Sequence, residues 1–499
     1  MSKLESDQLL LIFEKLSNDK KSLYSCLLVN KFWSQILVKI LWKDPWTSLL
    51  KEDGLEKAKL FFRTVLSQLP QDSRKFLMGR KIKLPEQQKP FFDYISNCKY
   101  IGHIYSADGK KDNDIYDYVF SDYSDTQRIE LKKEIYKLFI NKCTALTYLD
   151  LTNINYPLYE FPGAETNLSK ITHLRFDDKS SQLINGLSKI CKFIEKFDVN
   201  LTCSNSNLIK FIQVQENLKS IIIRDNNNEQ NLEKPYEIVG EAIIEQHKDN
   251  LIHLDLTLEN NVSFYNNLLL KLINVKKIVL YDSRYRNVAI HKQLKFSDTY
   301  PNLKVLQIGI SFSVAVKIIQ ATKDTIQMIW LDKGNQESEE QISQLLKAIS
   351  QHCQYLKFLK ICLKNENLED FKQLLIICKY LEGLYIYRGN IYNDDDGKGL
   401  LDVLVDSANN NLYKLQLHYC YFKIDTLNQF FKRWKGRKSL YLYPILANYY
   451  ENKLLSREEF NRNKKRFNDM IESYKKENVI KTFETSHDFM FKDLAEFKY

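Results

Sequence analysis

Residues 251–256 are Leu-Ile-His-Leu-Asp-Leu, and the spacing of their apolar side chains returns along most of the chain. Each motif has an apolar residue, two variable positions, a second apolar residue, one variable position and a third apolar residue. The alternation at its end predicts a short strand that places its last two apolar side chains on one face. Eleven motifs occur: Leu146-x-x-Leu149-x-Leu151, Ile171-x-x-Leu174-x-Phe176, Ile194-x-x-Phe197-x-Val199, Leu218-x-x-Ile221-x-Ile223, Leu251-x-x-Leu254-x-Leu256, Val275-x-x-Ile278-x-Leu280, Leu303-x-x-Leu306-x-Ile308, Ile326-x-x-Ile329-x-Leu331, Leu356-x-x-Leu359-x-Ile361, Leu381-x-x-Leu384-x-Ile386 and Leu412-x-x-Leu415-x-Leu417.

The motifs recur about every 27 residues, which lies within the period of leucine-rich repeats. The segments between them often have helical spacing, as in Leu345, Leu346 and Ile349. One strand and one helix cannot bury their apolar faces alone, so units of this kind stack into a solenoid. Three motifs follow a cysteine in the string Cys-x-x-Leu, at Cys143, Cys353 and Cys378. This resembles the cysteine-containing class of leucine-rich repeat, and it implies an α/β repeat fold in the form of an arc or horseshoe.

The first 46 residues have a different pattern, that of three short amphipathic helices. Ser6 is the predicted N-cap of the first helix, and Pro45 ends the third. Three helices in roughly 40 residues cannot bury all their apolar groups by themselves. The module therefore needs the following domain or a partner to cover the rest. The three stripes are Leu9, Ile12, Phe13 and Leu16; Leu23, Cys26, Leu27 and Asn30; and Trp33, Ile36, Leu37, Ile40 and Leu41.

This module resembles the F-box, and in particular the expanded F-box families of fungi. The string Leu28-Val29-Asn30-Lys31-Phe32-Trp33 is the most specific part of the resemblance. The family usually begins with Leu-Pro, whereas this chain has Leu4-Glu5, which weakens the expected first contact with an adaptor. The resemblance implies that the module binds a Skp-family adaptor through Leu4, Leu9, Leu10, Ile12, Phe13, Leu16, Leu23, Leu27, Val29, Asn30 and Trp33.

An F-box followed by leucine-rich repeats implies the substrate-recognition subunit of an SCF-type ubiquitin ligase. Such a chain is not an enzyme: the adaptor links it to a cullin and a RING subunit, and it contributes proximity and orientation. The alternative is a non-ligase repeat scaffold for protein interactions, in which the three helices merely cap the solenoid. A further rival is a nucleic-acid binder that works through the basic tail, which would lose affinity steeply with salt.

The patterns divide the chain into four parts. Residues 1–46 form the F-box-like module, and residues 47–140 form a helical linker region that includes an exposed acidic loop at 106–125. Residues 141–443 contain the repeats. Residues 444–499 form a charged helical cap or tail, with a predicted helix from Arg457 to Lys476.

Composition and charge limit the classes of function. The chain has 499 residues, of which 44% are apolar and 27% charged, as in folded proteins. No apolar run approaches the 18 or so residues of a membrane span, and no signal peptide is evident. The nine scattered cysteines predict reduced thiols and a location in the cytoplasm, the nucleus or both. Much of the net charge of +10 lies in residues 432–481, with 14 Lys or Arg against 6 Asp or Glu, which favours a solvated basic tail over a nucleic-acid site.

A protein substrate is expected on the concave surface of the repeats, on the residues that flank the buried positions of each strand. Exposed aromatic side chains beside basic ones are typical of interface hot spots. The later repeats are the richest in them, so the predicted substrate-binding residues are Trp330, Phe358, Lys360, Tyr385 and Tyr387. The alternative is that these rings pack against neighbouring repeats.

No chemistry of a catalytic site is evident in the sequence. Phosphate-binding loops, dinucleotide-binding fingerprints and zincin helices do not occur. The histidines are dispersed and no Cys-x-x-Cys pair exists, which argues against a zinc site. The run Asp394-Asp395-Asp396-Gly397 lacks the spacing of a calcium loop. We therefore expect no metal and no cofactor.

Overall fold

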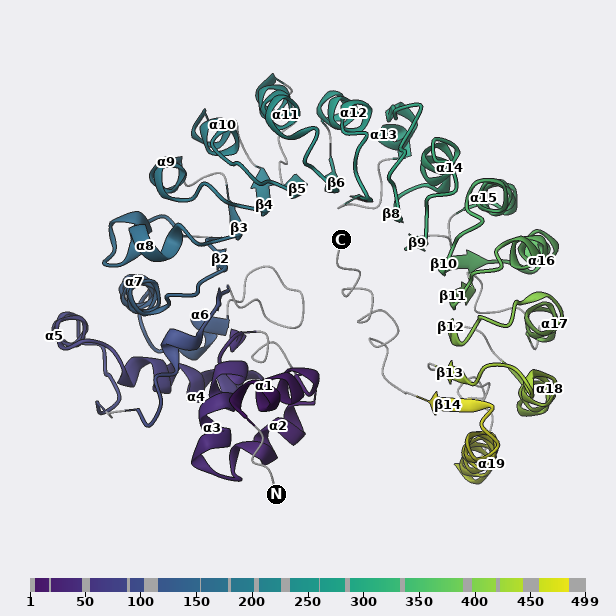
Figure 1. Ribbon diagram of the computed structural model, residues 1–499, viewed down its shortest axis with the longest axis horizontal. Helices are drawn as coiled ribbons and strands as arrows, with labels where there is room; N and C mark the ends of the chain where they lie inside the picture. The colour runs from purple at the N-terminus through teal and green to yellow at the C-terminus, as the bar shows by residue number, and fades with distance from the viewer. Residues whose placement is uncertain are drawn as a thin grey trace. The chain divides into compact units, whose positions relative to one another are not determined.

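The computed structural model describes residues 5–17, 19–46, 54–87, 90–102, 115–152, 154–177, 181–201, 206–225, 234–259, 261–282, 288–332, 337–388, 397–418, 422–442 and 457–483. The chain forms two compact units, Met1–Asn227 and Asn228–Tyr499. Within each unit, strands line one side and helices cover the other (Figure 1). We call the side of the strands that faces away from the helices the open face.

Unit 1 begins with helices and continues as a stack of strand–helix repeats. Its strands β1 to β5 pair in parallel with their neighbours in chain order. The helices are α1 Ser6–Lys15, α2 Lys20–Leu27, α3 Lys31–Leu41, α4 Gly54–Ser67, α5 Gln71–Gly79, α6 Ile115–Val119, α7 Asp125–Lys142, α8 Ala164–Leu168, α9 Ser181–Ile190 and α10 Ser206–Gln213. The strands are β1 Tyr100–Ile101, β2 Tyr148–Asp150, β3 His173–Asp177, β4 Lys196–Leu201 and β5 Ser220–Asp225.

Unit 2 continues the same alternation, and its strands β6 to β14 also pair in parallel in chain order. The strands are β6 His253–Leu258, β7 Lys277–Asp282, β8 Val305–Gly309, β9 Met328–Leu331, β10 Phe358–Leu363, β11 Gly383–Arg388, β12 Lys414–His418, β13 Leu440–Leu442 and β14 Ile480–Phe483. The helices are α11 Lys234–His247, α12 Val262–Lys271, α13 Val288–Gln293, α14 Phe312–Gln320, α15 Glu339–His352, α16 Leu368–Ile377, α17 Lys398–Ser407, α18 Ile424–Trp434 and α19 Arg457–Lys476.

The predicted α/β repeat solenoid is confirmed at the level of single strands, because every one of the eleven motifs forms a strand, β2 to β12. The apolar motif positions lie side by side in continuous rows. In unit 2, for example, Leu254, Ile278 and Leu306 are register partners on β6, β7 and β8, and each is at most 1% exposed. A full row of buried side chains is the reason that each repeat depends on its neighbours.

The cysteines of the motifs belong to this core. Cys143, Cys353 and Cys378 are fully buried, and all seven cysteines among the described residues are free thiols. Burial raises the pKa of the Cys378 thiol to about 12, so it stays protonated near neutral pH. These residues therefore act as small apolar side chains.

The linker region differs from its prediction in two places. A short strand, β1, pairs with β2, and the motif pattern does not predict it. Of the predicted loop at 106–125, residues 106–114 lie outside the described residues, while Ile115–Val119 is helix α6. Tyr116 and Phe120 are spaced four residues apart and both pack on Phe62, which explains why this polar-looking stretch is folded.

Candidate protein-interaction surfaces

The three N-terminal helices enclose a small core of their own. Leu9, Phe13, Leu23, Ile36 and Leu37 are buried together, and Leu10, Leu16, Leu27 and Trp33 pack against them. Phe13 and Trp33 meet edge to face, with their ring centroids 5.3 Å apart. These side chains therefore pack against one another and stabilise the module.

Polar residues fix where the helices begin. Asn30 precedes α3, and its Oδ1 accepts the N–H of Trp33 at 2.9 Å. Asp19 caps α2 in the same way through the N–H of Ser22, at 3.1 Å. The cap of α1 is Glu5, whose N–H donates to Gln8 at 3.2 Å, so the prediction of Ser6 as the cap was wrong by one residue. Ser6 is already the first helical residue.

Four apolar side chains remain exposed around the turn between α2 and α3, and we call them the α2–α3 patch. They are Tyr24, Leu28, Val29 and Phe32, which are 55%, 86%, 57% and 46% exposed. Leu28 is the C-cap of α2 with helical dihedral angles, so the spacing of four residues from Tyr24 places both on one side of the helix. On α1, Leu11 and Ile12 are also exposed. An exposed group of large apolar side chains is typical of a site that binds another protein.

The residues predicted to bind an adaptor therefore fall into separate groups. Ile12 and Val29 are exposed, Asn30 is a cap, and Leu4 lies outside the described residues. Leu9, Phe13 and Leu23 lie in the core, and Leu10, Leu16, Leu27 and Trp33 border it. Sequence reasoning did not include Leu11, Tyr24, Leu28 or Phe32 among them, although Leu28 and Phe32 stand in the string that carries the family resemblance.

The module is joined firmly to the rest of unit 1 by two tryptophans after α3. Trp42 packs on Phe61 of α4 and on Tyr94, with ring centroids 5.5 and 4.9 Å apart. Trp46 is buried, and its Nε1 donates to the carbonyl oxygen of Tyr100 on β1 at 2.5 Å. These contacts involve the C-terminal end of α3, so the α2–α3 patch is left uncovered.

The open face of unit 1 carries a ladder of alternating charges. Arg175 on β3 lies between Asp150 on β2 and Asp198 on β4, with N–O distances of 3.7 Å to each. Arg224 on β5 binds both carboxylate oxygens of Asp198 at 3.1 Å. The ladder pairs two cations with two anions, so it presents little net charge to a partner. These four residues flank buried motif positions, where the sequence predicts the concave surface, but none of them is among the predicted substrate-binding residues.

The open face of unit 2 holds the residues predicted to bind a substrate, on β9, β10 and β11. Trp330, Lys360 and Tyr385 are register partners. The Nζ of Lys360 lies 4.5 Å from the Trp330 ring centroid and 4.9 Å from that of Tyr385. It also forms an ion pair with Asp332, whose side chain accepts from Trp330 Nε1 at 2.5 Å. The structure therefore brings these three residues together as one cluster.

A tyrosine two strands away completes the polar side of this cluster. The hydroxyl of Tyr281 on β7 donates to Asp332 at 2.6 Å and is also bonded to Gln307. Burial and then the charge of Asp332 raise the pKa of Tyr281 well above its usual value, so it remains a donor. Lys360 is thus already neutralised by Asp332, and the aromatic surfaces are what this cluster can offer a partner.

Phe358 and Tyr387 are less accessible than their positions suggested. Phe358 is 8% exposed and packs with Val305 and Met328 along the same row of strands. Its ring lies over Gly383 of β11, where a Cβ would be 2.6 Å from Phe358 Cδ1. Tyr387 is 9% exposed and is the register partner of Cys362. Both rings pack against neighbouring repeats, which is the alternative that the sequence left open.

The described parts of the chain contain neither a metal-binding cluster nor a membrane-spanning helix. No group of three or more His, Cys, Asp and Glu side chains there could hold a metal ion. Likewise, no described helix combines the length and apolar character that crossing a membrane requires.

Comparison with known proteins adds distant likenesses. No family model matches the sequence. A putative ankyrin repeat protein, L767 of Acanthamoeba polyphaga mimivirus, is 27% identical over 183 residues, which is 35% of this chain and 28% of the relative. The chain thus matches less than a third of that relative's length.

Two solved structures are similar only at low scores. The leucine-rich repeat-containing protein LegL7 of Legionella pneumophila has a TM-score of 0.34 and 14% identity, over 58% of this chain and 89% of that one. The yeast Rad7 and Elc1 complex gives a TM-score of 0.33 and 13% identity, over 83% of this chain and 93% of that one. Scores this low establish no relationship. The chain's own strands and helices define an α/β repeat protein of the leucine-rich-repeat type.

Proposed function

We propose that this protein is the substrate-recognition subunit of an SCF-type ubiquitin ligase, in the cytoplasm or the nucleus, where its three-helix module binds a Skp-family adaptor. The observation that carries the proposal is the α2–α3 patch. The core of the module is already filled, yet Leu28 is 86% exposed beside three further apolar side chains. Burying a side chain such as leucine contributes roughly 1.5–3 kcal/mol, so a partner that covers the patch gains several kcal/mol.

The patch also argues against the alternative in which the module merely caps the repeats. A cap would turn its free apolar side chains toward the repeats that it covers. The contacts of Trp42 and Trp46 with the rest of unit 1 instead leave Tyr24, Leu28 and Val29 exposed. This arrangement favours docking of a second protein.

The test is co-purification of the full chain with a Skp-family adaptor, with and without the substitution Leu28→Asp. We expect a stoichiometric complex with the wild type and its loss in the variant, because a carboxylate would be buried in the apolar contact. Leu270→Asp is the matched control, since Leu270 is an exposed leucine on α12 of unit 2. Leu9 and Trp33 are unsuitable targets because their replacement would disrupt the module's core. A folded wild type that forms no complex would support the scaffold alternative.

We further propose that a protein substrate contacts the open face of unit 2 through Trp330, Lys360 and Tyr385. The half-buried rings of Trp330 and Tyr385, which lie on the strands on either side of Lys360, support this assignment. The double variant Trp330→Ala/Tyr385→Ala should still bind the adaptor, but a ligase that contains it should ubiquitinate the substrate less than a ligase that contains the wild type. Unchanged ubiquitination in a reconstituted ligase would place the substrate elsewhere.

A further inference from the structure

A hollow of about 970 Å³ opens on unit 1 beside the three-helix module. Helix α4 lines it with Leu60, Arg63 and Thr64, and residues after α5, among them Glu86 and Phe91, line it as well. It is an open cleft, and none of its lining residues belongs to the core of the three-helix module.

Two large apolar side chains of this cleft are exposed. Leu60 is 64% exposed and Phe91 is 73% exposed. Tyr94, another lining residue, is held against Trp42 with ring centroids 4.9 Å apart, so this part of the cleft is anchored to the end of α3. Leu60 lies on helix α4 and Phe91 lies near the anchored Tyr94, so both can bind a partner's apolar side chain with little loss of conformational entropy.

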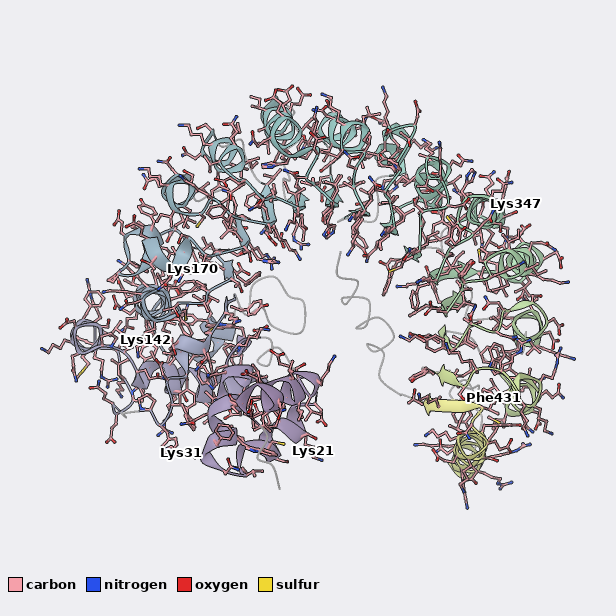
Figure 2. The ribbon with its side chains drawn as sticks, in the orientation of Figure 1. Lys21, Lys31, Lys142, Lys170, Lys347 and Phe431 are labelled. Carbon is pink, nitrogen blue, oxygen red and sulfur yellow. The ribbon has the colours of Figure 1, made fainter. Side chains whose placement is uncertain are left out.

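The cleft borders the α2–α3 patch. Lys31 is the first residue of α3, and its Nζ lies 5.7 Å from the centroid of the Phe91 ring. Phe32, a member of the patch, is the next residue along the chain. Figure 2 shows Lys31 at the edge of the three-helix module, and its contact with Phe91 links the sequence of the patch to the cleft.

The cleft carries more positive than negative charge. Arg63 is exposed, and within the described residues no ion pair or hydrogen bond engages its guanidinium. Lys31 adds a second cation at the rim, while Glu86 is the one carboxylate among the described residues that line the cleft. An anionic group on a partner is therefore favoured at Arg63, where a carboxylate can be bound by two parallel hydrogen bonds.

We propose that the protein bound at the α2–α3 patch continues across Lys31 into this cleft, where it places an apolar side chain between Leu60 and Phe91 and an acidic side chain on Arg63. The inference rests on the proposed function, because it takes the adaptor as the occupant. The size of the patch supports it: a stable interface uses roughly 20 to 30 residues from each partner, far more than the patch supplies. The cleft is the adjoining surface with suitable side chains.

The test measures the affinity of the full chain for the purified adaptor by titration calorimetry at two salt concentrations. Phe91→Ala should weaken binding by about tenfold, as expected for an aromatic anchor. The control Phe193→Ala removes an exposed phenylalanine elsewhere in unit 1 and should leave the affinity unchanged. Arg63→Glu should weaken binding by roughly three- to tenfold and lessen its dependence on salt, whereas Glu86→Lys should leave the affinity unchanged or raise it.

The outcomes separate this inference from the proposed function. If Leu28→Asp abolishes binding while Phe91→Ala and Arg63→Glu both bind like the wild type, the adaptor docks at the patch alone and the inference is overturned. Equal weakening by Arg63→Glu and Glu86→Lys would overturn the acidic contact. If the folded wild type does not bind the adaptor at all, the proposed function and the inference both fail.

Discussion

On the open face of unit 2, two glycines lie beneath aromatic rings of the neighbouring strand. A Cβ at Gly309 would lie 2.2 Å from Cδ1 of Tyr281, and one at Gly383 would lie 2.6 Å from Cδ1 of Phe358. Gly309 and Tyr281 are register partners, as are Gly383 and Phe358. The absence of a side chain at these positions is what lets each ring lie flat across the adjacent strand.

Gly309→Ala should therefore destabilise unit 2. The new methyl group would push the Tyr281 ring away and disturb its hydrogen bond to Asp332, at a cost of about 1–3 kcal/mol. Thermal unfolding followed by circular dichroism should show a lower midpoint than that of the wild type. Gly79→Ala is the control, because no atom lies within 4 Å of a Cβ at Gly79. Equal midpoints for both variants would mean that the ring moves aside without strain.

The burial of single residues could be predicted from the sequence only in part. The buried positions of each motif follow from spacing alone, since alternate residues of a strand share one face. The burial of Phe358 and Tyr387 does not, because it depends on which residue of the next strand stands in register. The ion pair of Lys360 with Asp332 likewise joins two repeats, and no pattern within one repeat indicates it.

At the scale of single elements, a side-chain cap fixes the start of helix α3. The Oδ1 of Asn30 accepts the N–H of Trp33, one of the N–H groups that have no partner within the helix. The family resemblance assigned Asn30 to adaptor binding, whereas its contact in the structure is with α3 itself. A cap of this kind contributes typically about 1 kcal/mol.

Asn30→Ala should loosen the first turn of α3. We expect faster hydrogen exchange of the amides at Phe32, Trp33 and Ser34, in keeping with the loss of about 1 kcal/mol. Asn30→Asp should restore protection, since aspartate also accepts the N–H of Trp33. Unchanged exchange in the alanine variant would show that packing of Trp33 on Phe13 holds this turn without the cap.

Long elements with a clear period could be predicted, and short ones could not. The helix α19 and the eleven motif strands lie close to their predicted positions. The strands β1, β13 and β14 have two to four residues each and carry no motif. Whether such a short stretch forms a strand depends more on pairing with the adjacent strand than on the local preference of its residues. In the three-helix module, the consecutive apolar residues Leu27, Leu28 and Val29 did not reveal which of them would be exposed.

At the scale of the whole molecule, the stacking of repeats determines how many repeats a single substitution destabilises. Leu306 on β8 is fully buried and lies in register between Ile278 on β7 and Ile329 on β9. Each repeat contacts only its neighbours, so stability is approximately a sum of terms from single repeats and from adjacent pairs. A cavity in one repeat should therefore weaken a few adjacent repeats and leave distant ones intact.

Leu306→Ala should lower the stability of this part of unit 2 by about 2–5 kcal/mol, through lost burial and the cavity left behind. Hydrogen exchange should accelerate in β7, β8, β9 and α14, while β12 and β13 keep their protection. Leu270→Ala, at an exposed site on α12, should change stability by less than about 0.5 kcal/mol. Exchange that accelerates evenly from β6 to β14 would contradict the prediction, because it would show that unit 2 unfolds as one cooperative block and that its repeats do not open separately.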